Sequence, residues 1–115
     1  MADEPQDQLP WDSPKVYGRR FAALDARLSR ALAGLEYRPE NDEEAGVLRY
    51  RLAKIAIAAE DIQRAIGVLA KEGSRDDWIA QALVETRSAC EEICDSFREV
   101  DPLLVRLLNF VDARG

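Results

Sequence analysis

The sequence predicts an all-α protein: an antiparallel, up-down-up bundle of three long helices followed by a short C-terminal helix. Three observations lead to this prediction. Apolar residues recur at alternating steps of four and three, the spacing of helices that pack side by side. Proline or capping residues mark the boundaries between these periodic segments. At 115 residues, the chain has the size of one domain with a single core.

The chain divides into an acidic tail, residues 1–12, and one helical domain, residues 13–115. The tail is interrupted by proline and has few apolar side chains, so we expect it to be extended or disordered. Trp11 is its exception. This side chain either packs the tail against the start of the first helix or belongs to a short docking motif.

A first helix is predicted over residues 14–35. Ser13 and Pro14 fit an N-cap followed by proline at the first helical position. Apolar side chains then follow one face at heptad spacing, while the outer face is basic: Lys15, Arg19, Arg20, Arg27 and Arg30. We expect this face to meet an acidic one, within the chain or across a dimer.

A second helix is predicted over residues 42–72, opened by a capping box of Asn41 and Glu44. Its main seam has strict four-three spacing: Leu48, Leu52, Ile55, Ala59, Ile62, Ile66 and Leu69. The helix is also apolar on a second face, formed by Val47, Tyr50, Ile57 and Val68. A helix that is apolar on two faces is usually covered on both, so this second face is predicted to contact a partner.

A third helix is predicted over residues 75–100. Gly73 fits a left-handed cap that ends the second helix, and Ser74 with Asp77 fits a capping box. Its predicted core seam is Ile79, Leu83, Thr86, Cys90, Ile93, Phe97 and Val100, and its outer face is acidic. Cys90 is therefore expected in the core with Cys94 beside it. A spacing of four residues on a helix suits a disulfide poorly, so both are interpreted as reduced thiols.

Asp101 and Pro102 are expected to end the third helix and to start a short fourth one, residues 103–113. Between residues 103 and 111 only Arg106 and Asn109 are polar. Leaving such a segment in water would expose several large side chains, each worth about 1.5–3 kcal/mol on burial. It should therefore fill a groove of its own domain or dock on another chain, through Leu104, Leu107, Leu108, Phe110 and Val111.

Composition excludes several functions. The net charge of −6 disfavours binding to nucleic acid or to an anionic membrane surface. The sequence contains no histidine, which rules out imidazole catalysis and histidine-ligated metal sites. It also contains no apolar run of about 18 residues and no apolar leader after Met1. These observations predict a cytoplasmic protein without a bound cofactor.

Two acidic runs suggest one alternative. Glu91, Glu92 and Asp95, followed by Phe97, resemble the ExxD motif of the MazG-like nucleotide pyrophosphohydrolases. Asp42, Glu43 and Glu44 are similar to the start of that family's EExxE motif, although Val47 stands where the last glutamate would fall. The resemblance covers about a tenth of the chain. It implies a magnesium-dependent nucleotide hydrolase with the ion held by Glu43, Glu44, Glu91, Glu92 and Asp95.

The main prediction is a different class, a non-enzymatic protein-interaction module. Its seams carry no catalytic polar residues, and the apolar faces exceed what one core needs. Such a module would self-associate, most simply as a dimer, or would mask a basic partner as an inhibitor, immunity protein, antitoxin or assembly subunit does. A third alternative is a carrier of an apolar ligand, with its pocket between the second and fourth helices.

Overall fold

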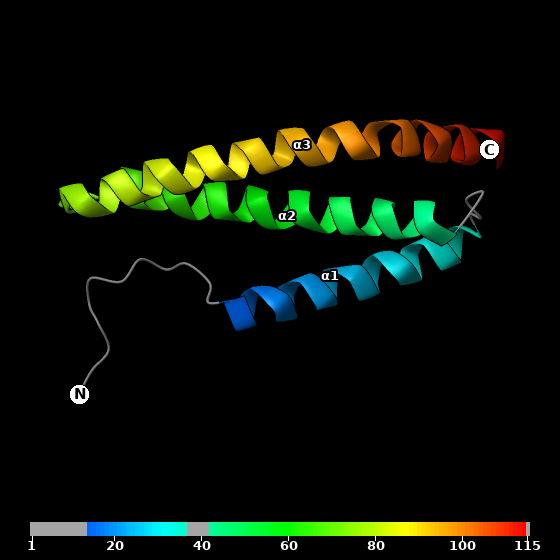
Figure 1. The fold of residues 1–115 in the computed structure, drawn as a ribbon, viewed down its shortest axis with the longest axis horizontal. Helices are drawn as coiled ribbons and strands as arrows, with labels where there is room; N and C mark the ends of the chain where they lie inside the picture. The colour runs from blue at the N-terminus through cyan, green and yellow to red at the C-terminus, as the bar shows by residue number, and fades with distance from the viewer. Residues whose placement is uncertain (1–13, 37–41, 115) are drawn as a thin grey trace.

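Three α-helices make up the part of the chain that the structure, a computed structural model, describes: residues 14–36 and 42–114. They are α1 (Pro14–Leu35), α2 (Asp42–Ala70) and α3 (Asp76–Arg114), drawn in Figure 1. The predicted all-helical class is confirmed, with α1 at its predicted bounds and α2 ending two residues early. The predictions made for the tail, Trp11, Ser13 and Asn41 lie outside the described residues.

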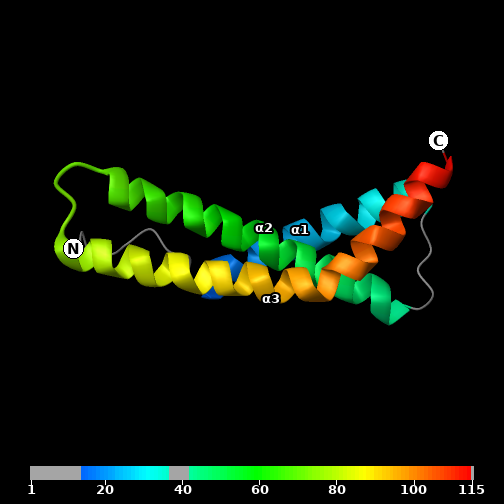
Figure 2. The ribbon, with the colours of Figure 1, turned by 90° about the horizontal axis from the view of Figure 1, so that it is seen from above.

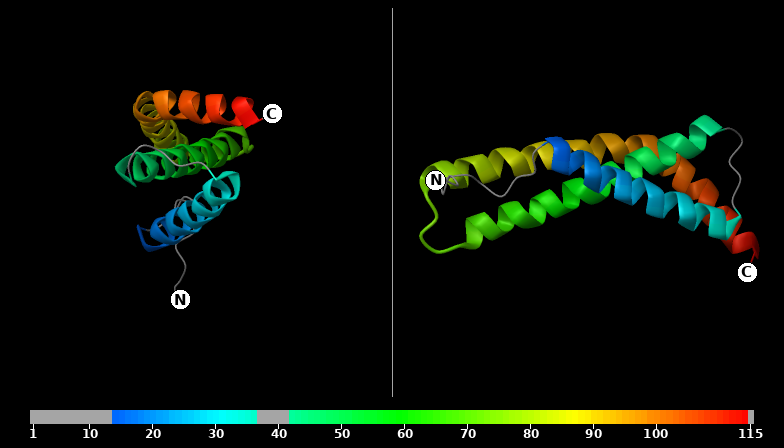
Figure 3. Two further views of the ribbon diagram at one scale, coloured as in Figure 1. Left: turned by 90° about the vertical axis from the view of Figure 1, so that its right-hand side faces the viewer. Right: turned by 90° about the horizontal axis from the view of Figure 1, so that it is seen from below.

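The three helices are stacked in the order α1, α2, α3, so that α2 lies between the other two (Figures 1 and 3). The chain reverses direction from α1 to α2 and again from α2 to α3 (Figure 1). No residue of α1 is buried, whereas both α2 and α3 contribute buried side chains. The stack is elongated, 54 × 27 × 23 Å, and its core lies almost entirely between α2 and α3.

The turn between α2 and α3 depends on one glycine. Gly73 has φ of 81°, a left-handed conformation that favours a residue without a side chain, as predicted for this cap. The expected capping box is not formed, because the Ser74 hydroxyl donates to the Val68 carbonyl instead, at 2.8 Å. At the start of α3, the Asp77 carboxylate accepts a hydrogen bond from the Trp78 amide at 3.0 Å.

The predicted helix boundary at Pro102 is wrong: α3, which is 39 residues long, runs through this proline to Arg114, and residues 103–113 are not a separate helix. Proline inside a helix removes one hydrogen bond and crowds the preceding turn, at a cost of about 3 kcal/mol. The bend in the orange part of α3 in Figure 2 relieves this crowding. Burial of Leu103 and packing of Leu104 and Leu107 against α2 offset the cost, since each such side chain contributes about 1.5–3 kcal/mol.

The core between α2 and α3 changes character along its length. Near the turn it consists of Ala65, Val68 and Ala82, with Trp78 packed against them. At the other end it contains larger side chains, Leu48, Val100 and Leu103. Small residues let two helix axes come close, while larger ones hold them apart, so the two ends of the core allow different distances between the axes of α2 and α3.

The core face of α3 agrees with the predicted one only in part. Val100 is fully buried, as predicted, and Ile79, Thr86 and Ile93 are half-buried. At the other three predicted positions the buried residue is the one before the residue predicted: Ala82, Ala89 and Ser96 in place of Leu83, Cys90 and Phe97. One residue corresponds to about 100° around a helix, so the larger apolar side chains are turned outward. Both thiols, Cys90 and Cys94, are exposed, which corrects the expectation that Cys90 lies in the core.

The core face of α2 also differs from the prediction. Of the predicted seam, Leu48 is fully buried, but Ala59, Ile66 and Leu69 are exposed. The buried positions include Ile57, at 1 % exposure, and Val68, both of which were assigned to a partner-binding face. That assignment is wrong for these two side chains, because α2 is covered by α3 on one side and by α1 on another.

Contacts at the edge of the stack hold α1 to α2. The ring of Phe21 stacks on Tyr17 and meets Tyr50 of α2 with a centroid distance of 5.4 Å. Arg20 forms an ion pair with Glu60 and lies 3.8 Å from the Asp61 carboxylate. Arg20 on the basic face of α1 therefore pairs with carboxylates of α2, whereas Lys15, Arg19, Arg27 and Arg30 are exposed.

Candidate interaction surface

The outer face of α3, turned away from α2, carries large apolar side chains. Leu83 is 54 % exposed, Phe97 51 % and Leu108 62 %. Val84 and Val105 on the same helix are exposed to a similar degree. Scattered apolar residues are normal on a protein surface, but a continuous line of them on one helix is typical of a contact surface.

Leu83, Phe97 and Leu108 belong to a second heptad seam, which we call the outer stripe; Val84 and Val105 are exposed but are not part of it. It has steps of four and three throughout: Leu83, Arg87, Cys90, Cys94, Phe97, Asp101, Leu104, Leu108 and Val111. All of these residues except the half-buried Leu104 are exposed. At 1.5 Å per residue the stripe is about 42 Å long. Its spacing is that of a helix which packs against another helix, knobs into holes.

The middle of the outer stripe is hollowed. A shallow groove lies around Cys90 and Cys94 and is bounded by Arg87, Glu91, Asp95 and Arg98. Cysteine is small, and the residues around each thiol stand three or four positions apart, the arrangement of a hole on a helix surface. Phe97, next to the hollow, projects as the largest knob of the stripe.

The predicted interaction residues at the C-terminal end divide between two faces. Leu104 and Leu107 pack against the α2 side chains Leu48 and Leu52 and are half-buried. Leu108 and Val111 are exposed on the outer stripe, while Phe110 is half-buried under the guanidinium of Arg114. This segment therefore fills a groove of its own chain with one face and leaves the other face open.

Of the remaining predicted interaction residues on α2, Val47 is half-buried at the edge of the core cluster. Tyr50 is 45 % exposed, but the Lys54 ammonium and the Arg51 guanidinium lie over its ring, and Phe21 packs beside it. The second apolar face of α2 is thus mostly occupied within the chain. The side chains of Leu52 and Ile55 also pack where a ligand pocket between α2 and residues 103–113 was considered.

The carboxylates of the pyrophosphohydrolase resemblance do not converge. Glu44 pairs with Arg106 at the end of the stack remote from the turn. Glu92 points toward α2, where its carboxylate lies 3.0 Å from the Lys54 ammonium. Asp95 lies on the exposed surface of α3, 3.5 Å from Arg98, and Glu43 and Glu91 are also exposed. Within residues 14–36 and 42–114, no group of three or more carboxylates or thiols is placed to hold a metal ion.

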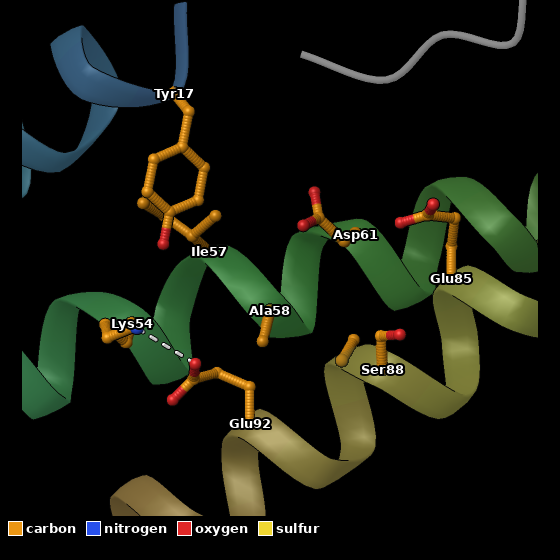
Figure 4. Close-up of a pocket in the computed structure, with 9 residues that line it drawn as sticks. Tyr17, Lys54, Ile57, Ala58, Asp61, Glu85, Ser88 and Glu92 are labelled. Atoms are coloured by element: carbon orange, nitrogen blue, oxygen red, sulfur yellow. Dashed lines mark ion pairs between the residues drawn. The ribbon is translucent and has the colours of Figure 1, made fainter. Parts of the chain in front are cut away.

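A small cleft lies where the three helices meet (Figure 4). Its volume is about 170 Å³, and Tyr17 of α1 reaches over Ile57 at one side. The floor and the other side are Ala58, Asp61, Glu85, Ser88, Ala89, Glu92 and Lys54. The dashed line in Figure 4 marks the Lys54–Glu92 ion pair, which closes one end of the cleft.

The charges in the cleft compensate one another. Burial is the largest influence on Glu92 and raises its pKa, but hydrogen bonds from Ser96 and Lys54 and the charges of Lys54 and Arg51 together lower the pKa below its usual value. The hydrogen bond to Glu92 is the main reason that the pKa of Lys54 is raised. Burial raises the pKa of Asp61 and that of Tyr17. These groups tie α2 to α3, and the geometry gives them a structural role.

No family model, no curated protein and no solved structure matches this chain. The described helices also contain no segment with the length and apolar character needed to cross a bilayer.

The sequence predicts the C-terminal part of the outer stripe, since Leu108 and Val111 are among the predicted interaction residues and both are exposed. It does not predict the rest as a free surface, because Leu83 and Phe97 are expected in the core. Val84 and Val105 are not among the predicted interaction residues. A signal was present in the sequence, since the four-three spacing continues from Cys90 through Phe97 to Val111 without a break at Pro102.

Proposed function

We propose that this chain is a non-enzymatic helical interaction module that associates with a second copy of itself through the outer stripe of α3. One observation carries the proposal: exposed residues of α3 follow one line at heptad spacing, and this line includes the large apolar side chains Leu83, Phe97, Leu108 and Val111. Side chains such as Leu83, Phe97 and Leu108 gain about 1.5–3 kcal/mol each when fully buried, so covering this line favours association.

The charges along the stripe favour a second copy over a basic partner. A surface that masks a basic protein needs an excess of negative charge, whereas the outer stripe and its borders carry both signs. Arg87 and Arg98 stand among Glu91, Asp95 and Asp101. A surface that carries charges of both signs can pair with an identical surface.

Self-association also accounts for the stacked arrangement. In one chain the helices do not surround a common axis, and α3 is covered on one face only. Two copies that meet along α3 would place helices on both sides of it and complete an antiparallel bundle of the kind the sequence predicts. No group of described side chains has the geometry of a magnesium site, so no observation favours the hydrolase alternative.

The test is the absolute mass in solution, measured by light scattering after size exclusion over a wide range of concentrations. We expect the mass to rise from the 12.9 kDa of one chain toward twice that value. Phe97→Glu should remain at the mass of one chain, because it places a carboxylate in the middle of the stripe.

Ile66→Glu is the matched control for this measurement. Ile66 is 54 % exposed, close to the value for Phe97, but it lies on α2. This variant should associate as the unmodified chain does. A mass of 12.9 kDa for the unmodified protein at every concentration would contradict the proposal.

A further inference from the structure

The outer stripe is self-complementary in one orientation only. The features of the stripe and its borders come in pairs placed nearly symmetrically about Asp95. Leu83 lies twelve residues before this position and Leu108 thirteen after it; Val84 lies eleven before and Val105 ten after. If two α3 helices crossed antiparallel at residue 95, each leucine would face the other leucine, and each valine the other valine.

The charged side chains follow the same symmetry with opposite signs. Glu91 lies four residues before Asp95 and Arg98 three after it, while Arg87 lies eight before and Asp101 six after. In the antiparallel orientation Glu91 therefore meets Arg98 of the other copy, and Arg87 meets Asp101, each pair occurring twice because of the twofold axis; Asp95, at the axis, lies beside its own copy. In a parallel, in-register pair the same residues would meet their own copies, glutamate against glutamate and arginine against arginine, which is repulsive.

The shape of the stripe agrees with this orientation. Phe97 lies two residues after Asp95 and Cys94 one before it, so a partner's Phe97 would stand opposite the hollow around Cys94. The bulky knob and the small-residue hole are thus placed at matching distances on the two sides of the axis. Asp95 and Arg98 now form an exposed intrahelical pair, which an intermolecular pair can replace at little cost.

We infer that two copies of this chain pair through α3 in antiparallel orientation, with the twofold axis at residue 95 and Glu91–Arg98 ion pairs across the interface. This inference rests on the proposed function and adds the orientation and register to it. Four features carry it: the exposed heptad line, the symmetric apolar pairs, the symmetric opposite charges and the matched knob and hollow.

The two native cysteines test the register. Cys94 lies one residue from the axis, so the two copies of Cys94 are offset by about 3 Å along the helices; the two copies of Cys90 are offset by about 15 Å. A disulfide needs Cα atoms within about 7 Å. Both thiols are exposed and open to a diazene oxidant such as diamide. The oxidant takes two electrons and two protons from two thiols as one S–S bond forms.

We expect diamide to convert the unmodified chain and Cys90→Ser to a covalent dimer on a non-reducing gel, and to leave Cys94→Ser monomeric. Two results would overturn the register but not the self-association. One is cross-linking that depends on Cys90; the other is the absence of cross-linking in a chain that light scattering shows to be dimeric. A chain that is monomeric in light scattering would overturn both the register and the proposed self-association. The outer stripe would then be covered by another protein or by residues 1–13.

Charge reversal tests the orientation independently of the cysteines. Arg98→Glu should weaken dimerisation about tenfold or more, because the introduced carboxylate would then face the partner's Glu91 at two symmetric places. Adding Glu91→Arg should restore most of the lost affinity, because opposite charges face each other again. In a parallel pair the double variant would bring no recovery, and that result would reject the antiparallel orientation.

Discussion

The two faces of α3 differ in a way that runs against the usual expectation. The inner face, packed on α2, is formed in its first half by the small residues Ala82, Ala89 and Ser96. The outer face presents Leu83 and Phe97 to solvent. At these heptads hydrophobicity alone would place Leu83 and Phe97 in the core, whereas the buried residues are the smaller Ala82 and Ser96. Close approach of the two helix axes requires small side chains, and this requirement decides the packing within the chain.

This difference indicates two separate uses of one helix. The inner face builds the hairpin by close contact, with larger side chains only beyond Val100. The outer face is left with apolar area that the single chain cannot cover. Three pairs of substitutions test this difference. In each pair, one residue on the inner face of α3 and one elsewhere on the same helix are changed in the same way.

The largest effect should come from a buried charge. Val100 is 0 % exposed and lies in the core cluster with Leu48 and Leu103, so Val100→Asp should cost about 3 kcal/mol or more and leave the chain largely unfolded. Val105→Asp places the same group on the same helix at a position that is 49 % exposed. It should change the stability of the single chain by less than about 1 kcal/mol. Circular dichroism during heating measures both, at a concentration at which light scattering gives the mass of one chain, because association would add to the measured stability. Equal losses would contradict the distinction between the faces.

A smaller effect is expected from a side chain that is too large. Ala82 is completely buried where α2 and α3 approach each other, so Ala82→Leu should destabilise the hairpin by about 1–3 kcal/mol. The same substitution at the exposed Ala80 should be nearly neutral. Urea denaturation gives both values. A stable Ala82→Leu variant would show that the axes can separate without loss, and that small residues are not what determines the inner face.

The smallest effect concerns the ion pair beside the inner face. The lowered pKa of Glu92 means that its contribution to stability is present above the ordinary pKa of 4.5 and is lost as the pH falls through the folded-state value. Glu92→Gln should therefore cost about 1 kcal/mol at pH 7, and the difference from the unmodified chain should vanish in acid. The raised pKa of Asp61 acts in the opposite direction, so its contribution increases as the pH falls.

The control for this prediction is Glu91→Gln. Glu91 is the exposed neighbour of Glu92 on the outer side of α3, and its replacement should leave the thermal midpoint of the single chain almost unchanged at either pH. Because Asp61 titrates in all three proteins alike, subtraction between them removes its effect. A pH-independent difference for Glu92→Gln would mean that the lost contact is one of packing rather than charge.

The sequence contained enough to predict the helical class, the bounds of α1, the start of α2 and the left-handed turn at Gly73. These features depend on local spacing and backbone preference, which a sequence displays directly. It could not indicate that Pro102 would be tolerated, because the compensation comes from contacts of Leu103 and Leu107 with α2, far away in the chain. Such contacts are set by tertiary packing and not by the residues around the proline.

The choice of core face failed for a related reason. In α3 the series through Leu83, Cys90 and Phe97 and the series through Ala82, Ala89 and Ser96 have the same heptad period. Period alone cannot distinguish them, and side-chain size favours the wrong one. What distinguishes them is the distance to α2, whose own small residues Ala58 and Ala65 lie in the interface. The exposed outer face of α3 could therefore be identified only once the packing of its inner face against α2 was known.

The way α1 is attached has a consequence for how the folded protein opens. This helix has no fully buried side chain, and it is held to α2 by ring contacts and ion pairs, by packing of Leu32 against the core cluster, and to α3 by a hydrogen bond from Arg114 to the Leu35 carbonyl. Its release would uncover Ile57, over which Tyr17 lies, but would leave the contacts between α2 and α3 in place. The native state then opens in two ways with different free energies: release of α1 costs less, and separation of α2 from α3 costs more. Dissolved salt screens the contacts of α1 far more than those between α2 and α3, so ionic strength sets how often this helix is released.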